Sequence, residues 1–158
     1  MNAGATTQLV IEKAKPDIFV NVGFCGGFKA EVSVGDTVLV TDVVQYDFDL
    51  TLFGRKLGFI PGISCVRLPL TVINITNSIF KSGTFLKGDR VFQDKNYATR
   101  LYKLFKPSVI EMELGAIAQV CILNKIKLVS LKIPTDIEEN EDQSDWKNNF
   151  KKMFQNNL

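Results

Sequence analysis

The sequence predicts an α/β protein in which a mixed, twisted sheet is flanked by helices on both faces. Segments with apolar residues at helical spacing alternate along the chain with short β-branched runs. Glycine, proline and polar clusters separate these segments at regular intervals. The 158 residues are 46% hydrophobic and 23% charged, so the chain can bury one core, and we expect a single domain over residues 1–158.

The first predicted element is a helix over residues 2–15, which ends before Pro16. The run DIFVNVGFCGGF, residues 17–28, is β-branched and leads into a glycine-rich turn, which is typical of a strand buried on both faces. Residues 34–51 predict one long strand or two. Residues 54–68 contain glycine and proline and predict an irregular loop.

The second half of the chain continues the alternation. Residues 68–83 predict a helix that starts near Pro69, although their β-branched content lowers the helix propensity. The remaining predicted elements are a strand and turn over 83–92, a helix over 95–105, a strand over 108–113, a helix over 114–125, a strand over 126–136 and a final helix from near 144 or 145.

Composition excludes several classes of function. The net charge is only +2 and no basic stripe is interleaved with aromatics, so we expect no nucleic-acid partner. No apolar stretch is long enough to cross a membrane and the start lacks the pattern of a secretion signal, which together predict a cytoplasmic protein. Cys25, Cys65 and Cys121 form no CxxC pair and histidine is absent, so we expect reduced thiols and no metal site. Acid–base chemistry must therefore use carboxylates, lysine or tyrosine.

Polar or glycine-rich residues follow three of the predicted strands, in the segments NVGFCGG, IEME and KIPTD. Ligands of α/β sheets collect at the carboxyl ends of strands, so these segments can form one site. The spacing of Glu111 and Glu113 predicts that both side chains point to one side of the strand, with Met112 on the other. A sugar with vicinal hydroxyls suits a buried carboxylate, which can only accept hydrogen bonds. The alternative is that both acids are partly solvated at a strand end.

These segments, with DFDLTLFG, GDRVF and VIEMELGAIAQVC, resemble the nucleoside phosphorylase and nucleosidase superfamily. Within it, the chain is most similar to 5'-methylthioadenosine/S-adenosylhomocysteine nucleosidases, in order from about residue 2 into the last predicted helix. The resemblance implies a nucleoside phosphorylase-like domain, a nucleoside as small-molecule substrate, no cofactor and a homodimer. The implied reaction is hydrolysis that releases adenine, as in methionine salvage and nucleoside catabolism.

The resemblance also implies roles for single residues. Glu113 would hold the ribose 2'- and 3'-hydroxyls, Met112 would pack against the sugar, and Glu111 would shape the ribose and water site. Asp136 would be the general acid that protonates the purine at N7, and a desolvated strand-end aspartate can keep its proton near neutral pH. The alternative for Asp136 is a helix N-cap or a loop acid.

Other implied contacts lie outside the strand ends. Val91 and Phe92 match the segment that stacks on adenine and reads its edge through backbone groups. A second set of residues would close the partner subunit's pocket around the 5'-alkylthio group; these are Leu50, Phe53 and Pro61. The alternative is that they serve ordinary core and loop packing.

The chain also departs from the family pattern. Gly26 lies in the substrate-binding turn, but Phe24 stands where the family has serine or threonine and would crowd the sugar pocket. Lys132 replaces an arginine that helps to hold the catalytic water or an anion, and an ammonium cannot reproduce that planar fork.

The start of the chain differs most from the family. Family members carry further residues before the helix at which this chain begins, including the first strands of the sheet and the glutamate that activates the water; Glu12 does not replace that glutamate. We therefore expect a domain that is incomplete at its N-terminus, with impaired turnover. The alternatives are a purine nucleoside phosphorylase and a non-catalytic nucleoside-binding or dimerising protein.

Overall fold

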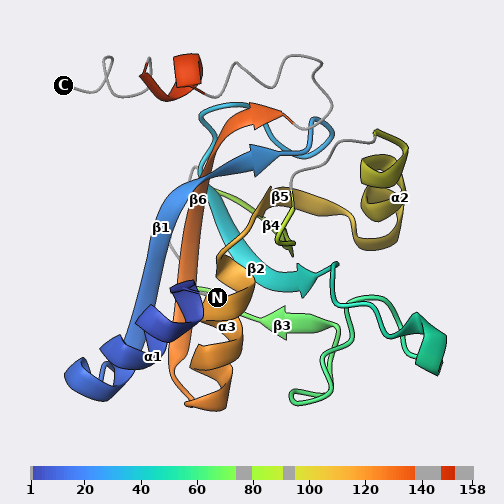
Figure 1. Ribbon diagram of the computed structural model, residues 1–158. Coiled ribbons are helices and arrows are strands. Elements are labelled where there is room, and N and C mark those ends of the chain that lie inside the picture. The colour runs from blue at the N-terminus through green and yellow to red at the C-terminus, as the bar shows by residue number, and fades with distance from the viewer. Residues whose placement is uncertain (1, 74–79, 91–94, 138–146, 152–158) are drawn as a thin grey trace.

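The computed structural model describes residues 2–73, 80–90, 95–137 and 147–151 (Figure 1). Most elements lie where the sequence predicts them, and residues 147–151 add a short helical segment. In chain order the elements are α1 (Asn2–Ala14), β1 (Ile18–Gly27), β2 (Val38–Gln45), the 3₁₀ turn η1 (Thr51–Phe53), β3 (Arg67–Pro69), β4 (Lys81–Lys87), α2 (Lys95–Phe105), β5 (Pro107–Glu111), α3 (Leu114–Leu123) and β6 (Lys127–Ile137).

The strands form one mixed sheet in the order β3-β2-β4-β5-β1-β6, which confirms the predicted mixed sheet. The pairs β2–β4, β4–β5 and β1–β6 are parallel, whereas β1–β5 and β2–β3 are antiparallel. Strand β2 also pairs with β6, through Val38 with Lys132 and Leu39 with Leu131. This additional pairing closes β2, β4, β5, β1 and β6 into a barrel-like ring.

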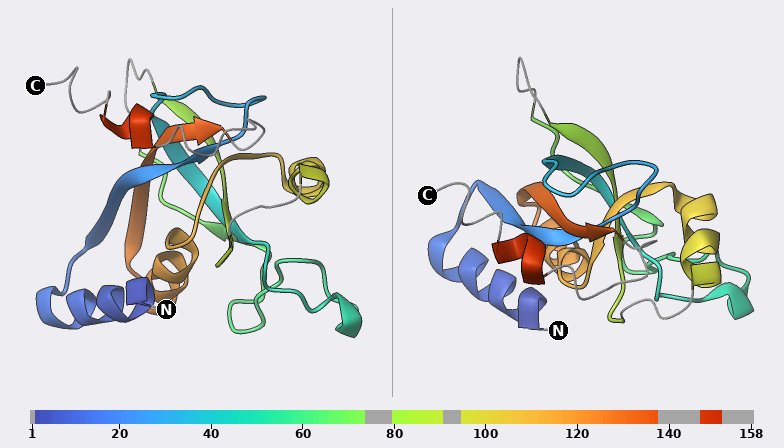
Figure 2. Two further views of the ribbon diagram at one scale, coloured as in Figure 1. Left: turned by 45° about the horizontal axis from the view of Figure 1, so that its top comes forward. Right: turned by 90° about the horizontal axis from the view of Figure 1, so that it is seen from above.

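The helices flank the sheet in two places. Helices α1 and α3 lie side by side at one end, while α2 stands apart from them (Figure 2). The contact between α1 and α3 is close, because a Cβ at Gly4 would lie 3.6 Å from Ala116 Cβ. Helix α2 presents Leu101 and Phe105 to a second core cluster that includes Tyr46. The spacing of its apolar residues gives it one buried face.

Strand β1 differs from the prediction that it is buried on both faces. Its exposure alternates along the strand, and Val20 and Val22 are 56% and 64% exposed. Residues 18–25 pair only with β6, and β5 joins β1 only at Gly26 and Gly27. The prediction was wrong because β-branched composition reports strand preference and does not report whether a second layer covers the strand.

The predicted helix over residues 68–83 is also wrong in its described parts. Strand β3 ends at Pro69, β4 begins at Lys81, and residues 70–73 form no regular element. Both ends of the segment pair with β2, through Leu68 with Val43 and Lys81 with Val38, and this pairing outweighs the helical spacing. Residues 74–79 lie outside the described residues.

Helices α1, α2 and α3 are each followed by a lysine in the left-handed backbone region. Lys15 follows α1 with φ of 45°, Lys106 follows α2 with φ of 50°, and Lys125 lies just beyond α3 with φ of 58°. Glycine or asparagine usually occupies such positions. Proline follows two of these lysines, at Pro16 and Pro107, and prevents the helix from continuing.

Paired valine-to-threonine substitutions test the exposed face of β1. Val43→Thr places a hydroxyl in the buried centre of β2 and should lower the free energy of unfolding by about 1–3 kcal/mol. Val22→Thr makes the same change on the exposed face and should cost less than about 0.5 kcal/mol. Urea unfolding of both variants measures these values. Equal costs would show that the face of β1 is buried in solution.

Candidate functional site

Glu111 ends β5 and also caps the next helix. Its Oε1 accepts hydrogen bonds from the backbone N–H groups of Glu113, at 2.8 Å, and Leu114, at 2.6 Å. An acid suits this position because the N-terminus of α3 carries unpaired N–H groups and a partial positive charge. Its Oε2 lies 3.6 Å from Nζ of Lys132, and the Glu111 side chain is only 13% exposed.

The pKa of Glu111 is raised from 4.5 to about 7, and burial is the largest cause. A hydrogen bond with the Glu113 carboxyl and the negative charge of that group also raise the pKa, while Lys132 and the N–H of Leu114 lower it. The site therefore holds a carboxyl group that changes charge near neutral pH.

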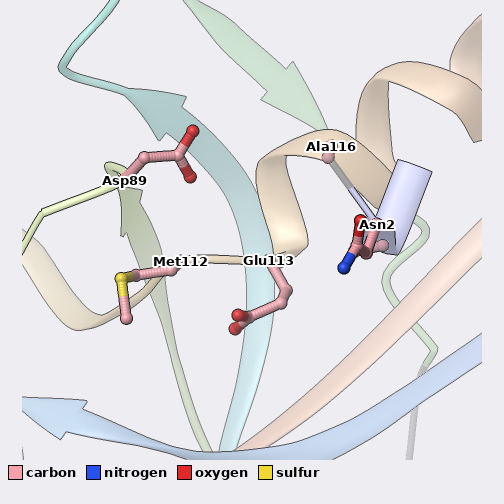
Figure 3. A pocket seen from close by; sticks show the side chains of 6 residues that line it. Asn2, Asp89, Met112, Glu113 and Ala116 are labelled. Carbon is pink, nitrogen blue, oxygen red and sulfur yellow. The ribbon is translucent and has the colours of Figure 1, made fainter. Parts of the chain in front are cut away.

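A cavity of about 310 Å³ opens beside this helix start. Figure 3 shows Asp89 and Met112 on one side, Asn2 of α1 on the other, and Glu113 between them. Its lining residues are Asn2, Ala3, Asp89, Met112, Glu113 and Ala116. The two adjacent acids thus differ in environment, since Glu113 is exposed to the cavity and Glu111 is nearly buried. The sequence predicted a buried carboxylate at the sugar and the resemblance assigned that role to Glu113, but the buried acid is Glu111.

Asp136 lies near the end of β6 at the same end of the sheet. Gly26 of β1 pairs with Asp136 on one side and with Ile110, the residue before Glu111, on the other. Burial raises the pKa of Asp136, and a 2.9 Å hydrogen bond from the Thr135 hydroxyl partly offsets the rise. The sheet therefore brings the predicted acid within two strand spacings of Glu111, about 10 Å. Asp136 does not itself line the described cavity.

The two departures from the family pattern also have defined surroundings. Lys132 is buried, and its Nζ lies near Glu111 and 5.6 Å from the centre of the Phe85 ring. The Phe24 ring meets the Phe150 ring edge to face, with centroids 4.9 Å apart. Lys132 thus belongs to the carboxylate site, whereas Phe24 contacts the C-terminal helical segment.

Three further predicted site residues are not among those that line the cavity. The segment that connects β2 and β3 contains Leu50, Phe53 and Pro61. Phe53 is 76% exposed and is not part of the core. Val91 and Phe92 lie outside the described residues.

The sequence predictions did not include Lys87 or four of the residues that line the cavity, which are Asn2, Ala3, Asp89 and Ala116. Lys87 is buried and pairs with Asp89 at 2.8 Å. One signal for Lys87 was present: Phe85 and Lys87 have the period-two spacing of one strand face, and Phe85 is fully buried. Asn2 and Ala3 gave no signal, because they reach the cavity only through the packing of α1 on α3.

A family model described as the Phosphorylase superfamily matches residues 1–158. The chain belongs to the phosphorylase superfamily.

This superfamily member is similar to curated 5'-methylthioadenosine/S-adenosylhomocysteine nucleosidases. It is 32% identical over 151 residues to the one from Bacillus subtilis, covering 89% of this chain and 65% of the relative. It is 31% identical over 148 residues to the one from Haemophilus ducreyi, covering 88% of this chain and 64% of the relative. The chain thus spans slightly less than two thirds of the length of these relatives.

Solved structures show the same fold. The nucleosidase of this name from Colwellia psychrerythraea, solved in complex with adenine, has a TM-score of 0.79 at 26% identity and covers 92% of this chain and 65% of its own. The 5'-methylthioadenosine nucleosidase of Arabidopsis thaliana has a TM-score of 0.70 at 30% identity and covers 92% of this chain and 59% of its own. The nucleoside phosphorylase-like fold expected from the sequence is confirmed.

The raised pKa of Glu111 predicts a pH-dependent stability. Between its ordinary pKa of 4.5 and its folded pKa of about 7, the folded protein binds more protons than the unfolded chain, so the free energy of unfolding falls as the pH rises. Glu111→Gln removes this loss. Between about pH 5 and about pH 8, the free energy of unfolding of the variant should rise relative to that of the wild type by on the order of 1 kcal/mol or more.

Unfolding by urea at the two pH values measures the difference. Glu12→Gln, which alters an exposed acid on α1, serves as the control and should follow the wild type. A constant difference between Glu111→Gln and the wild type would contradict the assignment.

Proposed function

We propose that this superfamily member hydrolyses the N-glycosidic bond of adenine nucleosides, with 5'-methylthioadenosine and S-adenosylhomocysteine as substrates. The observation that carries the proposal is the register at Gly26, which holds Asp136 and the start of the Glu111–Glu113 segment on either side of one strand. The names of the relatives support the choice of substrate, as does the adenine bound to the Colwellia structure.

Asp136 is the general acid in this proposal. Proton transfer to N7 of the purine turns the base into a neutral leaving group as the ribose becomes an oxocarbenium ion. Burial raises the pKa of Asp136, which favours the protonated form that this step requires. The Thr135 hydroxyl donates to Oδ1 and orients the carboxyl group.

The sugar lies in the cavity of Met112 and Glu113. Glu113 accepts hydrogen bonds from the 2'- and 3'-hydroxyls, and its exposure to the cavity leaves its oxygens accessible to a ligand. Glu111 lies behind it with one oxygen held by backbone N–H groups and the other beside Lys132. This arrangement can position a water molecule or a sugar hydroxyl at the reacting face. A carboxylate close to the ribose also stabilises a cationic sugar.

The remaining roles follow the resemblance. Val91 and Phe92 contact adenine, and Gly26 leaves room for the ligand. We further infer a cytoplasmic homodimer in which a group of loop residues closes the partner's pocket; these are Leu50, Phe53 and Pro61. The exposure of Phe53 supports this surface role. Among the described residues, none of the helices has the length and hydropathy needed to cross a membrane.

Adenine release tests the reaction and the role of Asp136. Asp136→Asn cannot deliver a proton to N7 and should lower kcat for 5'-methylthioadenosine by about 10²–10⁴-fold. Asp36→Asn, which changes a half-buried acid that pairs with Lys81 and does not line the cavity, is the control and should retain activity. Product is measured with and without inorganic phosphate, and equal rates are expected for hydrolysis. Undiminished turnover by Asp136→Asn would contradict the assigned acid.

Ligand-induced stabilisation tests the ribose contact. Adenosine and 5'-methylthioadenosine should raise the melting temperature, and their 2'-deoxy analogues should do so much less, because Glu113 loses a hydrogen-bond donor. Glu113→Ala should abolish the difference between the ribo and deoxy ligands. Equal stabilisation of the wild type by both kinds of ligand would exclude the proposed contact.

A further inference from the structure

Lys87 is a buried lysine that pairs with Asp89, one of the residues that line the cavity. It is the last residue of β4, and its side chain is only 4% exposed. Its Nζ lies 2.8 Å from Asp89 Oδ1 and 3.8 Å from Asp47 Oδ2. A buried ammonium is costly unless it is paired, so these two carboxylates determine where the side chain can lie.

Two hydrogen bonds hold the turn at residues 88–90 against Tyr46 and Asp47, which follow the end of β2. Asp47 Oδ2 accepts the backbone N–H of Asp89 at 2.8 Å, and the Tyr46 hydroxyl donates to the carbonyl of Arg90 at 3.2 Å. Gly88 is required beneath the Tyr46 ring, because a Cβ there would lie 2.2 Å from the ring carbon Cζ. This turn carries Asp89 into the cavity.

The stem of Lys87 packs against the helix that follows Glu113. A Cβ at Gly115 would lie 2.8 Å from Lys87 Cγ and 3.0 Å from Cδ, so the stem lies against the first turn of α3. Gly115 follows Glu113 by two residues, and Glu113 and Asp89 both line the cavity (Figure 3). Strand register also pairs Lys87 with Glu111.

We propose that Lys87 is a positioning residue that sets the distance between the turn at 88–90 and the first turn of α3, and thereby the fit of the nucleoside between Asp89 and Glu113. Its ammonium holds the turn and its stem holds the helix. The proposal rests on the proposed function for the identity of the ligand. The spacing of the two turns can be tested without that ligand.

Lys87→Met separates the charge from the stem, because it keeps most of the stem and removes the ammonium. Amide hydrogen exchange at residues 88–90 should become at least about tenfold faster, and the Kd for 5'-methylthioadenosine should rise at least about tenfold. Lys81→Met is the matched control, since Lys81 starts the same strand and pairs with Asp36 at 2.7 Å. This substitution should leave both the amide exchange at residues 88–90 and the Kd for 5'-methylthioadenosine unchanged.

A double substitution tests the stem. Gly115→Ala pushes a methyl group against Lys87 and should weaken binding of 5'-methylthioadenosine. In the Lys87→Ala background the same methyl group has room, so it should cause no further loss of binding and should raise the melting temperature through helix propensity. Additive losses would overturn the proposal, because they would show that the methyl group at residue 115 does not act through the Lys87 stem.

The outcomes separate the two proposals. If the wild type binds the nucleoside and Lys87→Met binds it equally well, the role of Lys87 is overturned and the proposed function stands. If the wild type binds no nucleoside, the proposed function fails, and amide exchange alone decides whether Lys87 holds the turn. Unchanged exchange at residues 88–90 in Lys87→Met overturns the positioning role in either case.

Discussion

The close approach of strands at Gly26 and Gly27 determines the geometry of the site. These two residues alone pair β1 with β5, while β1 pairs with β6 along its whole length. A Cβ at Gly27 would lie 2.6 Å from Val32 Cγ2, so no larger residue fits without displacing a core side chain. Because Glu111 ends β5 and Asp136 nearly ends β6, this short junction sets the separation of the acids to which we assign substrate contact and proton transfer.

Buried cations organise the acids on both sides of this junction. Lys132 lies beside Glu111, and Lys87 lies between Asp47 and Asp89. Burying an ammonium costs several kcal/mol unless it is paired, so each lysine stabilises the fold only when its carboxylates are in place. The lysines therefore restrict the acids to one arrangement, while Glu113 remains exposed and available to a ligand.

Sequence patterns predicted the elements better than the layers around them. The strand-end segments at Gly26, Glu111 and Asp136 were expected to converge, because parallel strands bring their carboxyl ends to one edge. The burial of Lys87 was not predicted, since a lysine at a strand end is normally solvated. The exposed face of β1 and the strands within 68–83 were missed for a related reason: burial and pairing depend on partners far away in the chain.

Two opposing contributions to stability act at each lysine that follows a helix. A left-handed backbone costs a side-chain-bearing residue about 1–2 kcal/mol, which glycine would avoid. A positive charge near a helix C-terminus returns about 0.3–1 kcal/mol through the helix dipole. At Lys106 the ammonium also lies 4.6 Å from the centre of the Tyr102 ring. Added electrolyte screens the charge but leaves the backbone cost unchanged. The tolerance of this fold to ionic strength is thus partly set at Lys15, Lys106 and Lys125.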